Sequence, residues 1–396
     1  MRRIGANYII TNTGEALRNA YLEVEDNGTI SRVVRNNIEA KEVANLEFYN
    51  GVIVPGFVNT HAHLELSYMK GAIETKKGLP YFISSLQKIR FESENKVILK
   101  AIEQANIEMQ NEGIVLVGDI SNATDSIECK KKSPIVYKTF VEVFSLDQYK
   151  AHEIFDKARL IQNNFKRNKL EASVTPHAPY SVSGKLFELI TELSYQENAT
   201  ISIHNQETES ENQMFIDKTG SLVEFFRSVG INLDSFYPSG YNSTPSTIVQ
   251  LPKCSKLNLV HNTFSSQEDI DKVLAYNSHS YWTLCPNANL YIENRLPDID
   301  LLHKNRLRLC LGTDSLASNH RLSILEEIKT IQKYFPQIPF IDLIKWSSYN
   351  GAEALDKLTI FGSFEEGKKP GVLLIENFDF ESFKLKDISK VKVLKV

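Results

Sequence analysis

The chain has 396 residues, of which 42% are apolar, and 45 basic against 49 acidic residues give a formal net charge of −4. This composition is typical of a packed globular protein, and it contains no basic block dense enough to bind nucleic acid or an anionic membrane surface. Because the apolar stretch near the N-terminus is also too short for a signal peptide or a membrane span, we expect a cytoplasmic protein whose partner is a small molecule, with assembly into a homo-oligomer left open.

Short alternating segments around glycines and Asn-Gly pairs begin the chain, and similar segments end it. Such pairs favour tight hairpin turns, so both ends are expected to form short β-strands. Because a few strands cannot bury a face alone, we expect the two ends to associate. The sequence therefore predicts a small β-sandwich domain made of residues 1–55 and 361–396, next to a central domain of residues 56–360.

In the central region, apolar runs of strand length alternate with segments of helical periodicity, as in repeated βα units. Eight such runs occur, at residues 52–61, 113–121, 135–144, 170–177, 199–205, 257–262, 280–287 and 307–314. Eight parallel strands are enough to close a (β/α)8 TIM barrel, which is the α/β fold that we predict. The segment 221–256 is rich in Gly, Pro and Ser, and it is expected to form a loop or lid near the mouth of this barrel.

Polar side chains fall at the ends of several predicted strands. His61 and His63 end the first run, and their side chains share one face because residues i and i+2 of a strand point the same way. The other such residues are His177, His204, His261 and Asp314, at the ends of the fourth, fifth, sixth and eighth runs. Catalytic groups of a parallel barrel gather at this rim, so the side chains are expected to converge. Taken singly, each histidine also reads as a hydrogen-bonded loop residue and Asp314 as a helix N-cap.

Imidazoles combined with one carboxylate are typical ligands of a divalent metal. Zn²⁺ suits this donor set best, and Fe²⁺ and Mn²⁺ are alternatives because affinity alone does not select the ion. The residue types at the rim therefore predict a metal site.

Six motifs, in order PGFVNTHAHLELS, PHAPYS, HNQETESE, LVHN, CPNANL and LGTDSLASN, resemble those of the amidohydrolase superfamily. They are most similar to its aminohydrolase branch, which includes methylthioadenosine/S-adenosylhomocysteine deaminases, guanine and cytosine deaminases, chlorohydrolases and aminodeoxyfutalosine deaminases. The later segment GSFEEGKKPGVLLI looks like the closing segment of the family, so the resemblance spans nearly the whole chain. It implies a hydrolytic deaminase that uses metal-bound hydroxide to release ammonia from an aminated purine nucleoside-like or other heterocyclic substrate.

The resemblance also implies a set of metal ligands. It makes His61, His63, His204 and Asp314 the ligands of a single divalent metal, because no lysine ends the fourth run, where dinuclear relatives carry a bridging lysine. A metal lowers the pKa of bound water from about 15.7 toward about 7, which makes hydroxide available near neutral pH. Asp314 is then expected to accept a proton as well as to bind the metal.

The remaining motif residues take roles in proton transfer and substrate binding. By the resemblance, Glu207 in HNQE is the proton shuttle, and His261 lies beside the attacked carbon. His177 in TPHAPYS is implied to bind the substrate, although it can also be an outer residue that braces a ligand. Arg90, at the end of a predicted helix, suits either a substrate carboxylate or a solvated helix end.

Two departures from the family pattern leave the substrate open. The segment LCPNAN lacks the leading histidine and the serine of the usual H-C-P-x-S-N motif, and the segment SYMKGAIETKKGLPYFISSLQKIR lacks elements of the methylthioadenosine/S-adenosylhomocysteine deaminases. The latter segment is closer to aminodeoxyfutalosine deaminases of menaquinone biosynthesis. The alternatives are such a deaminase, a chlorohydrolase or amide-ring hydrolase, and an inactive scaffold, the last disfavoured because every ligand is present.

Overall fold

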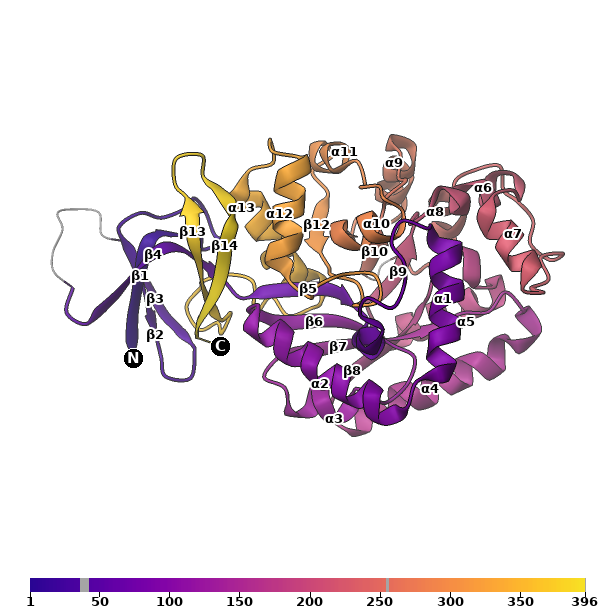
Figure 1. Cartoon of the computed structure of the whole chain (residues 1–396), viewed down its shortest axis with the longest axis horizontal. Coiled ribbons are helices and arrows are strands. Elements are labelled where there is room, and N and C mark those ends of the chain that lie inside the picture. Colours follow the sequence, from indigo (N-terminus) through magenta and orange to yellow (C-terminus); the bar gives the residue numbers. More distant parts are fainter. Residues whose placement is uncertain (36–42, 254–255, 396) are drawn as a thin grey trace.

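The structure is a computed structural model that describes residues 1–35, 43–253 and 256–395. Figure 1 shows a small β-sheet at one end of the molecule and a larger α/β unit beside it. None of the helices in the described ranges combines the length and the apolarity that a membrane span requires.

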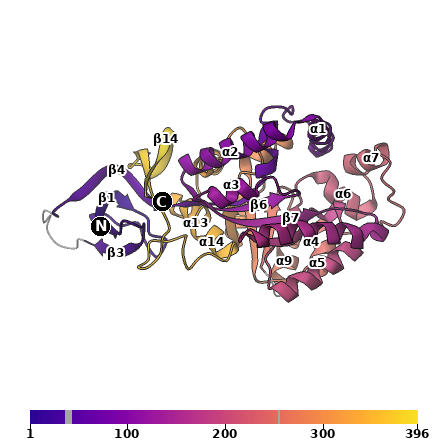
Figure 2. The same ribbon diagram turned by 90° about the horizontal axis from the view of Figure 1, so that it is seen from below.

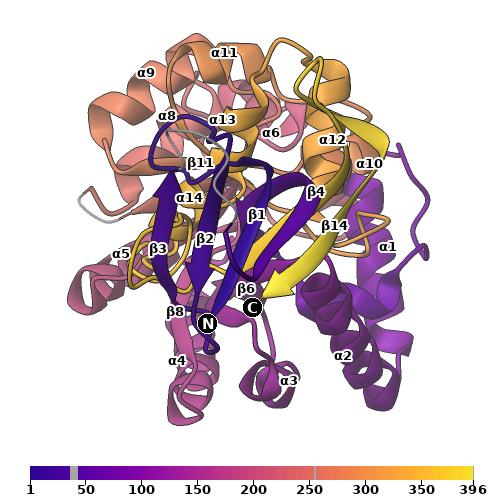
Figure 3. The same ribbon diagram turned by 90° about the vertical axis from the view of Figure 1, so that its left-hand side faces the viewer.

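Both ends of the chain contribute strands to the small sheet, in which the strand order is β14-β13-β4-β1-β2-β3. Its strands are β1 (Arg2–Ile9), β2 (Ala20–Val24), β3 (Ile30–Arg35), β4 (Leu46–Pro55), β13 (Val372–Asp379) and β14 (Lys384–Lys395). β13 pairs antiparallel with β4, and Val372 lies opposite Pro55. In β2 the buried residues Ala20, Leu22 and Val24 alternate with half-buried ones, as expected of a sheet that buries one face. Figure 3 views the molecule from the side of this sheet.

The larger unit is built on eight parallel strands, as the eight apolar runs predict. They are β5 (Phe57–Ala62), β6 (Ile114–Ser121), β7 (Val136–Val143), β8 (Glu171–Pro176), β9 (Ile201–Asn205), β10 (Leu257–His261), β11 (Ser280–Leu284) and β12 (Arg308–Leu311). They form two four-stranded sheets, β5-β6-β7-β8 and β12-β11-β10-β9. A parallel bridge between Ala62 and Asp314 links the two sheets at one edge. At the other edge the His204 N–H donates to the carbonyl of His177 over 2.9 Å. The predicted α/β fold of the TIM-barrel type is confirmed.

Helices follow the strands and cover the outside of the barrel (Figure 2). They are α1 (Leu79–Glu92), α2 (Asn95–Asn111), α3 (Ile127–Lys132), α4 (Ala151–Arg167), α5 (Gly184–Glu197), α6 (Glu209–Asp217), α7 (Ser221–Ser228), α8 (Ser243–Thr247), α9 (Gln267–Tyr276), α10 (Pro286–Ile292), α11 (Ile299–Lys304), α12 (Ile324–Tyr334), α13 (Phe340–Trp346) and α14 (Tyr349–Ala354). In α4 the buried residues Ala151, Ala158 and Phe165 recur every seven positions, so one stripe faces the core. α9 begins with a capping box between Ser266 and Asp269.

The first apolar run is divided between the two parts of the molecule. Residues up to Pro55 belong to β4 in the small sheet, and β5 begins only at Phe57 in the barrel. Gly56 separates them, and a Cβ atom at this position would lie 2.5 Å from the carbonyl oxygen of Pro370 and 2.6 Å from Cγ1 of Val115. The prediction of one strand over 52–61 is therefore wrong, because both halves are apolar and only the crowding at Gly56 marks the break.

The segment 221–256 is more regular than the loop predicted there. It begins with α7, and α8 follows after an irregular stretch. Leu222, Val223 and Phe226 of α7 are buried in a cluster with Leu79 of α1 and Tyr180. The Gly, Pro and Ser residues that follow α7 favour a loop, whereas the apolar residues within α7 have the spacing of a helix that buries one face.

Candidate active site

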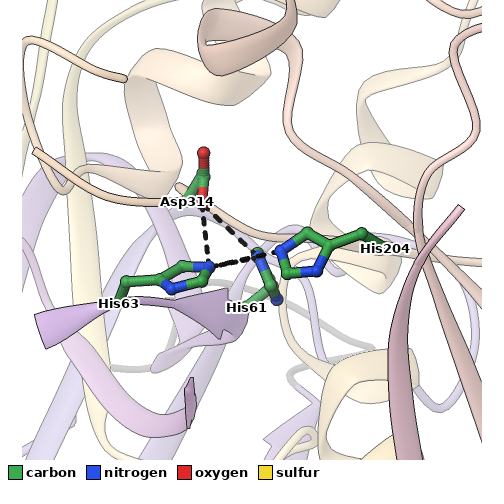
Figure 4. Close-up of side chains that lie close together, drawn as sticks. All are labelled: His61, His63, His204 and Asp314. Carbon is green, nitrogen blue, oxygen red and sulfur yellow. Dashed lines mark hydrogen bonds and ion pairs between the residues drawn. The ribbon is translucent and has the colours of Figure 1, made fainter. Parts of the chain in front are cut away.

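Four predicted ligands converge at the C-terminal ends of the barrel strands (Figure 4). His61 lies in β5, His63 follows β5, His204 lies in β9, and Asp314 comes three residues after β12. One nitrogen or oxygen of each side chain lies within 4.8 Å of the others. Nε2 of His63 is 3.1 Å from Nε2 of His61 and 3.3 Å from Nε2 of His204. Oδ1 of Asp314 lies 3.4 Å from Nε2 of His61 and 3.3 Å from Nε2 of His63.

The tautomer of His204 suits a metal ligand. Its Nδ1 lies 2.8 Å from the backbone carbonyl of His177. Because a carbonyl only accepts hydrogen bonds, Nδ1 carries the hydrogen, and Nε2 presents a lone pair to the cluster. Burial, followed by the charges of His177 and His61, holds the pKa of His204 well below its usual range, so the ring is neutral. A neutral imidazole with its free nitrogen aimed at other donors fits a metal ion.

The Asp314 carboxylate is fixed by its backbone and by a serine. Asp314 has φ +55°, and the N–H groups of Thr313 and Asp314 both donate to the carbonyl of His61 over 3.1 Å. The hydroxyl of Ser318 donates to Oδ2, which leaves Oδ1 facing the histidines. Burial would raise the pKa of Asp314, but the hydrogen bond to His61 and the charges of His63 and His61 hold it well below its usual range. The alternative role as a helix N-cap is wrong, because residues 315–322 form no helix.

Glu207 and His261 form a second group beside the ligands. Oε1 of Glu207 lies 3.6 Å from Nε2 of His261, and both residues are buried. Burial, followed by the charges of Asp314 and Glu293, raises the pKa of Glu207 well above its usual range. Burial lowers the pKa of His261 to about 3. Burial thus favours the protonated form of the Glu207 carboxyl and the neutral form of the His261 imidazole.

The LCPNAN segment, which departs from the family pattern, contacts His261 through Asn289. Nδ2 of Asn289 lies 3.2 Å from Nδ1 of His261 and donates to Oγ1 of Thr263 over 2.9 Å. With the amide nitrogen as donor, Nδ1 of His261 is the acceptor, and its Nε2 carries the hydrogen that faces Glu207. The sequence motif drew attention to this segment but did not assign a role to Asn289.

His177 lies next to the ligands at the end of β8. The ring centroids of His177 and His204 are 4.8 Å apart, and Nδ1 of His177 is 2.7 Å from Oγ of Ser181. The half-exposed ring of Phe144 lies 5.9 Å from the ring of His177. The backbone carbonyl of His177 thus orients the His204 ring, which agrees with the alternative role of His177 as an outer residue that braces a ligand. Substrate binding by the His177 side chain stays a prediction.

Glu142 is a site residue that the sequence reasoning missed. It lies on β7, and its Oε1 is 3.5 Å from Nδ1 of His204. Glu142, His177 and His204 form a second group of potential ligands whose atoms lie within 4.8 Å of one another. Its signal in the sequence is an acidic residue near the end of the apolar run 135–144. Arg90 lies in the last turn of α1, and its role stays open.

The sequence profile of the amidohydrolase family matches residues 52–394. The chain belongs to the amidohydrolase family. It is 25% identical over 346 residues to an adenosine deaminase of Helicobacter pylori. The aligned residues cover 86% of this chain and 79% of that protein. It is also 25% identical to an aminodeoxyfutalosine deaminase of Nitratiruptor sp., with 71% of this chain and 67% of that protein covered.

Solved structures with the same fold cover nearly the whole chain. A Helicobacter pylori aminofutalosine deaminase in complex with methylthio-coformycin is similar with a TM-score of 0.79 and 20% identity, over 98% of this chain and 94% of the other. An atrazine chlorohydrolase from Arthrobacter aurescens, in complex with zinc, is similar with a TM-score of 0.74 and 15% identity. This similarity covers 99% of this chain and 94% of the chlorohydrolase. The aminohydrolase branch inferred from the motifs is confirmed by these relatives.

Proposed function

We propose that this amidohydrolase is a metal-dependent hydrolytic deaminase, which replaces the exocyclic amine of an aminated purine nucleoside-like substrate by oxygen and releases ammonia. The observation that carries this proposal is the Glu207–His261 pair beside the three histidines and Asp314. A protonated carboxyl at this place suits a reaction in which a ring nitrogen must gain a proton. The similarity to two named deaminases supports the same reaction class.

His61, His63, His204 and Asp314 would hold one divalent ion, for which we propose Zn²⁺, with Fe²⁺ and Mn²⁺ as alternatives. When bound, such an ion lowers the pKa of a coordinated water toward about 7, which supplies the nucleophile. A second ion at Glu142, His177 and His204 is disfavoured, because Nδ1 of His204 already donates to the carbonyl of His177.

Three side chains would handle protons and charge. Glu207, whose pKa burial raises, donates its proton to the ring nitrogen next to the attacked carbon. His261 donates its Nε2–H to the oxygen that adds to this carbon and so stabilises the charge that develops there. Asp314 accepts the proton that the attacking water loses and passes it to the departing amine, which leaves as ammonia. The hydroxyl left on the carbon gives its proton to Glu207, which restores the protonated carboxyl. Water and the amidine thus give an amide-like ring and ammonia.

An ammonia-release screen tests the proposal. The zinc-loaded protein is incubated with adenosine, 5′-deoxyadenosine, methylthioadenosine, S-adenosylhomocysteine, aminodeoxyfutalosine, guanine and cytosine, and with a chlorotriazine as the halide arm. Ammonia from one of the amines supports a deaminase and identifies the substrate class. Chloride release without any ammonia would make the chain a chlorohydrolase, and a protein that binds no metal and releases neither product would be an inactive scaffold. The cytoplasmic location of the protein and its assembly into a homo-oligomer stay predictions.

A further inference from the structure

The α8 segment, defined as residues 242–247, lies in the second half of the insertion formed by residues 221–256 and contacts the chain around Glu207. α8 lies beside α6 in Figure 1. Oγ of Ser243 donates to Oε1 of Glu211 over 2.6 Å, and both side chains are fully buried. Oγ1 of Thr244 donates to Oδ1 of Asn205, the last residue of β9, over 2.8 Å. These bonds join the α8 segment to α6 and to the strand end that precedes the predicted proton shuttle.

Gln206, between Asn205 and Glu207, has an unusual backbone conformation. Its φ is +48°, in the left-handed region that residues other than glycine rarely adopt. Such a conformation persists only when its surroundings hold it in place. Because the backbone at Gln206 sets the direction of the next residue, it determines whether the Glu207 carboxyl faces His261.

Every polar group of Gln206 has a partner. Its N–H donates to Oε1 of Glu211 over 3.0 Å, and its carbonyl accepts from the N–H of Phe264 over 3.1 Å. Nε2 donates to Oδ1 of Asn212 over 3.1 Å and to Oδ2 of Asp269 over 3.0 Å. Oε1 accepts from the hydroxyl of Ser265.

The same three acceptors also receive hydrogen bonds from the α8 segment. Ser243 reaches Glu211 through its hydroxyl and Asn212 through its N–H, the latter over 3.1 Å. Nδ2 of Asn242 donates to Oδ2 of Asp269 over 2.9 Å. Glu211, Asn212 and Asp269 therefore each bridge Gln206 to the insertion. The second oxygen of Glu211 accepts from the N–H of Glu207 itself over 3.3 Å.

We propose that the α8 segment is a positioning element for Glu207, with Ser243 and Glu211 acting through the backbone of Gln206. The inference rests on the proposed role of Glu207 as the proton carrier, and it gives the 221–256 insertion a function in turnover. Neither Ser243 nor Glu211 belongs to the predicted ligand set. Loss of their bonds is therefore expected to misplace the carboxyl without removing the metal.

The primary test is Ser243→Ala in the full chain, measured with the substrate that the screen identifies. Because a misplacement of about 1 Å can cost up to about a hundredfold in rate, we expect kcat to fall about tenfold or more, with KM and metal content unchanged. Thr247→Val is the matched control. Thr247 lies in the same helix and is buried, and its hydroxyl has no hydrogen-bond partner within the described ranges. A kcat for Ser243→Ala equal to that of this control would overturn the inference.

A second pair of variants tests the α8 segment without deleting a contact made by Ser243. Thr244→Val removes the bond to Asn205 at nearly constant volume, whereas Thr244→Ser keeps the hydroxyl. We expect kcat to fall for the valine variant and to be retained by the serine variant. Equal rates for the two variants would contradict the proposal, and this pair decides the matter if Ser243→Ala does not fold.

A double-variant cycle separates this inference from the proposed function. If Ser243 acts through Glu207, Ser243→Ala lowers the parental kcat but does not lower further the residual rate of Glu207→Gln. An equal fold-loss in both backgrounds would show a general structural effect and overturn the inference alone. A parental rate for Glu207→Gln by itself would instead overturn the assigned role of Glu207, on which the inference depends.

Discussion

The two halves of the candidate site are built in different ways. In the proposed metal-holding half, His61 and His204 lie within regular strands and His63 follows one directly, so the barrel itself brings their nitrogens together. In the proposed proton-handling half, Glu207 follows the left-handed Gln206, and His261 ends β10 with φ +76°. The three histidines of the first half depend on strand geometry, whereas Glu207 depends on a turn that hydrogen bonds from distant segments hold in place. Variants in the two halves should therefore have separable effects, on metal content in the first and on turnover in the second.

Loss of a ligand should have the largest effect. In His204→Ala, Nε2 is removed from its place 3.3 Å from Nε2 of His63, and we expect bound metal to fall from about one ion per chain to nearly none. Turnover should be lost with it, and elemental analysis beside an activity assay measures both. His303→Ala is the control, because His303 pairs with Asp342 outside the cluster. Two ions per parental chain, or one ion in His204→Ala, would contradict the assignment of a single site.

Removal of the proton carrier should come next and should leave the metal in place. Glu207→Gln keeps the size of the side chain but cannot transfer a carboxyl proton, so turnover should fall by about two to four orders of magnitude. Metal content should stay at the parental value. Glu209→Gln makes the same substitution at an exposed position two residues away and should retain activity. If Glu207→Gln loses the ion instead, Glu207 is a ligand and the division between the two halves fails.

A smaller effect is expected from the hydroxyl that fixes Asp314. Ser318→Ala removes the hydrogen bond to Oδ2, and loss of such an outer partner typically weakens metal binding by about 10 to 100-fold. Competition with a chelator measures the affinity, while kcat at saturating metal should change little. Ser315→Ala is the comparison, since the hydroxyl of Ser315 bonds to Ser318 rather than to the carboxylate. An unchanged affinity would show that the backbone alone orients Asp314.

The sequence predicts the metal-holding half well because its signals are local. A strand places residues i and i+2 on one face, and a parallel barrel gathers strand ends at one rim, so the positions of His61, His63 and His204 in the sequence are enough to predict that they meet. The eight strands are predicted from their apolar runs, because this signal also lies within each short segment of the sequence. The break between β4 and β5 at Gly56 could not be predicted in this way, because the crowding around Gly56 comes from Pro370 and Val115, which lie far away in the sequence.

The surroundings of the proton-handling half could not be predicted in the same way. The motif suggests Glu207, but nothing in it indicates that Gln206 adopts φ +48° or that Ser243 supports it from an insertion. The bond from Ser243 to Glu211 joins residues 32 apart in the sequence, and neither partner forms a periodic pattern. Glu142 is an intermediate case, because an acidic residue within an apolar run is visible in the sequence although its partner is not.

The smallest expected effect concerns Glu327, which supports the loop after Asp314 and the start of α10. Its oxygens accept from the N–H of Asn287 over 2.9 Å and from Nδ2 of Asn319 over 2.8 Å. Burial raises its pKa from 4.5 to about 8. Between these two values the folded protein retains a proton that the unfolded chain releases, so the free energy of unfolding should decrease as the pH rises through this window.

The variant Glu327→Gln tests this expectation. Its free energy of unfolding should decrease less steeply with pH than that of the parent, as measured by urea unfolding at pH 5, 6.5 and 8. Some slope should remain, because burial also raises the pKa values of Glu65 and Glu211 to about 7. A slope equal to that of the parent would show that Glu327 is ionised in the fold and that charge, rather than a neutral carboxyl, holds the Asp314 loop.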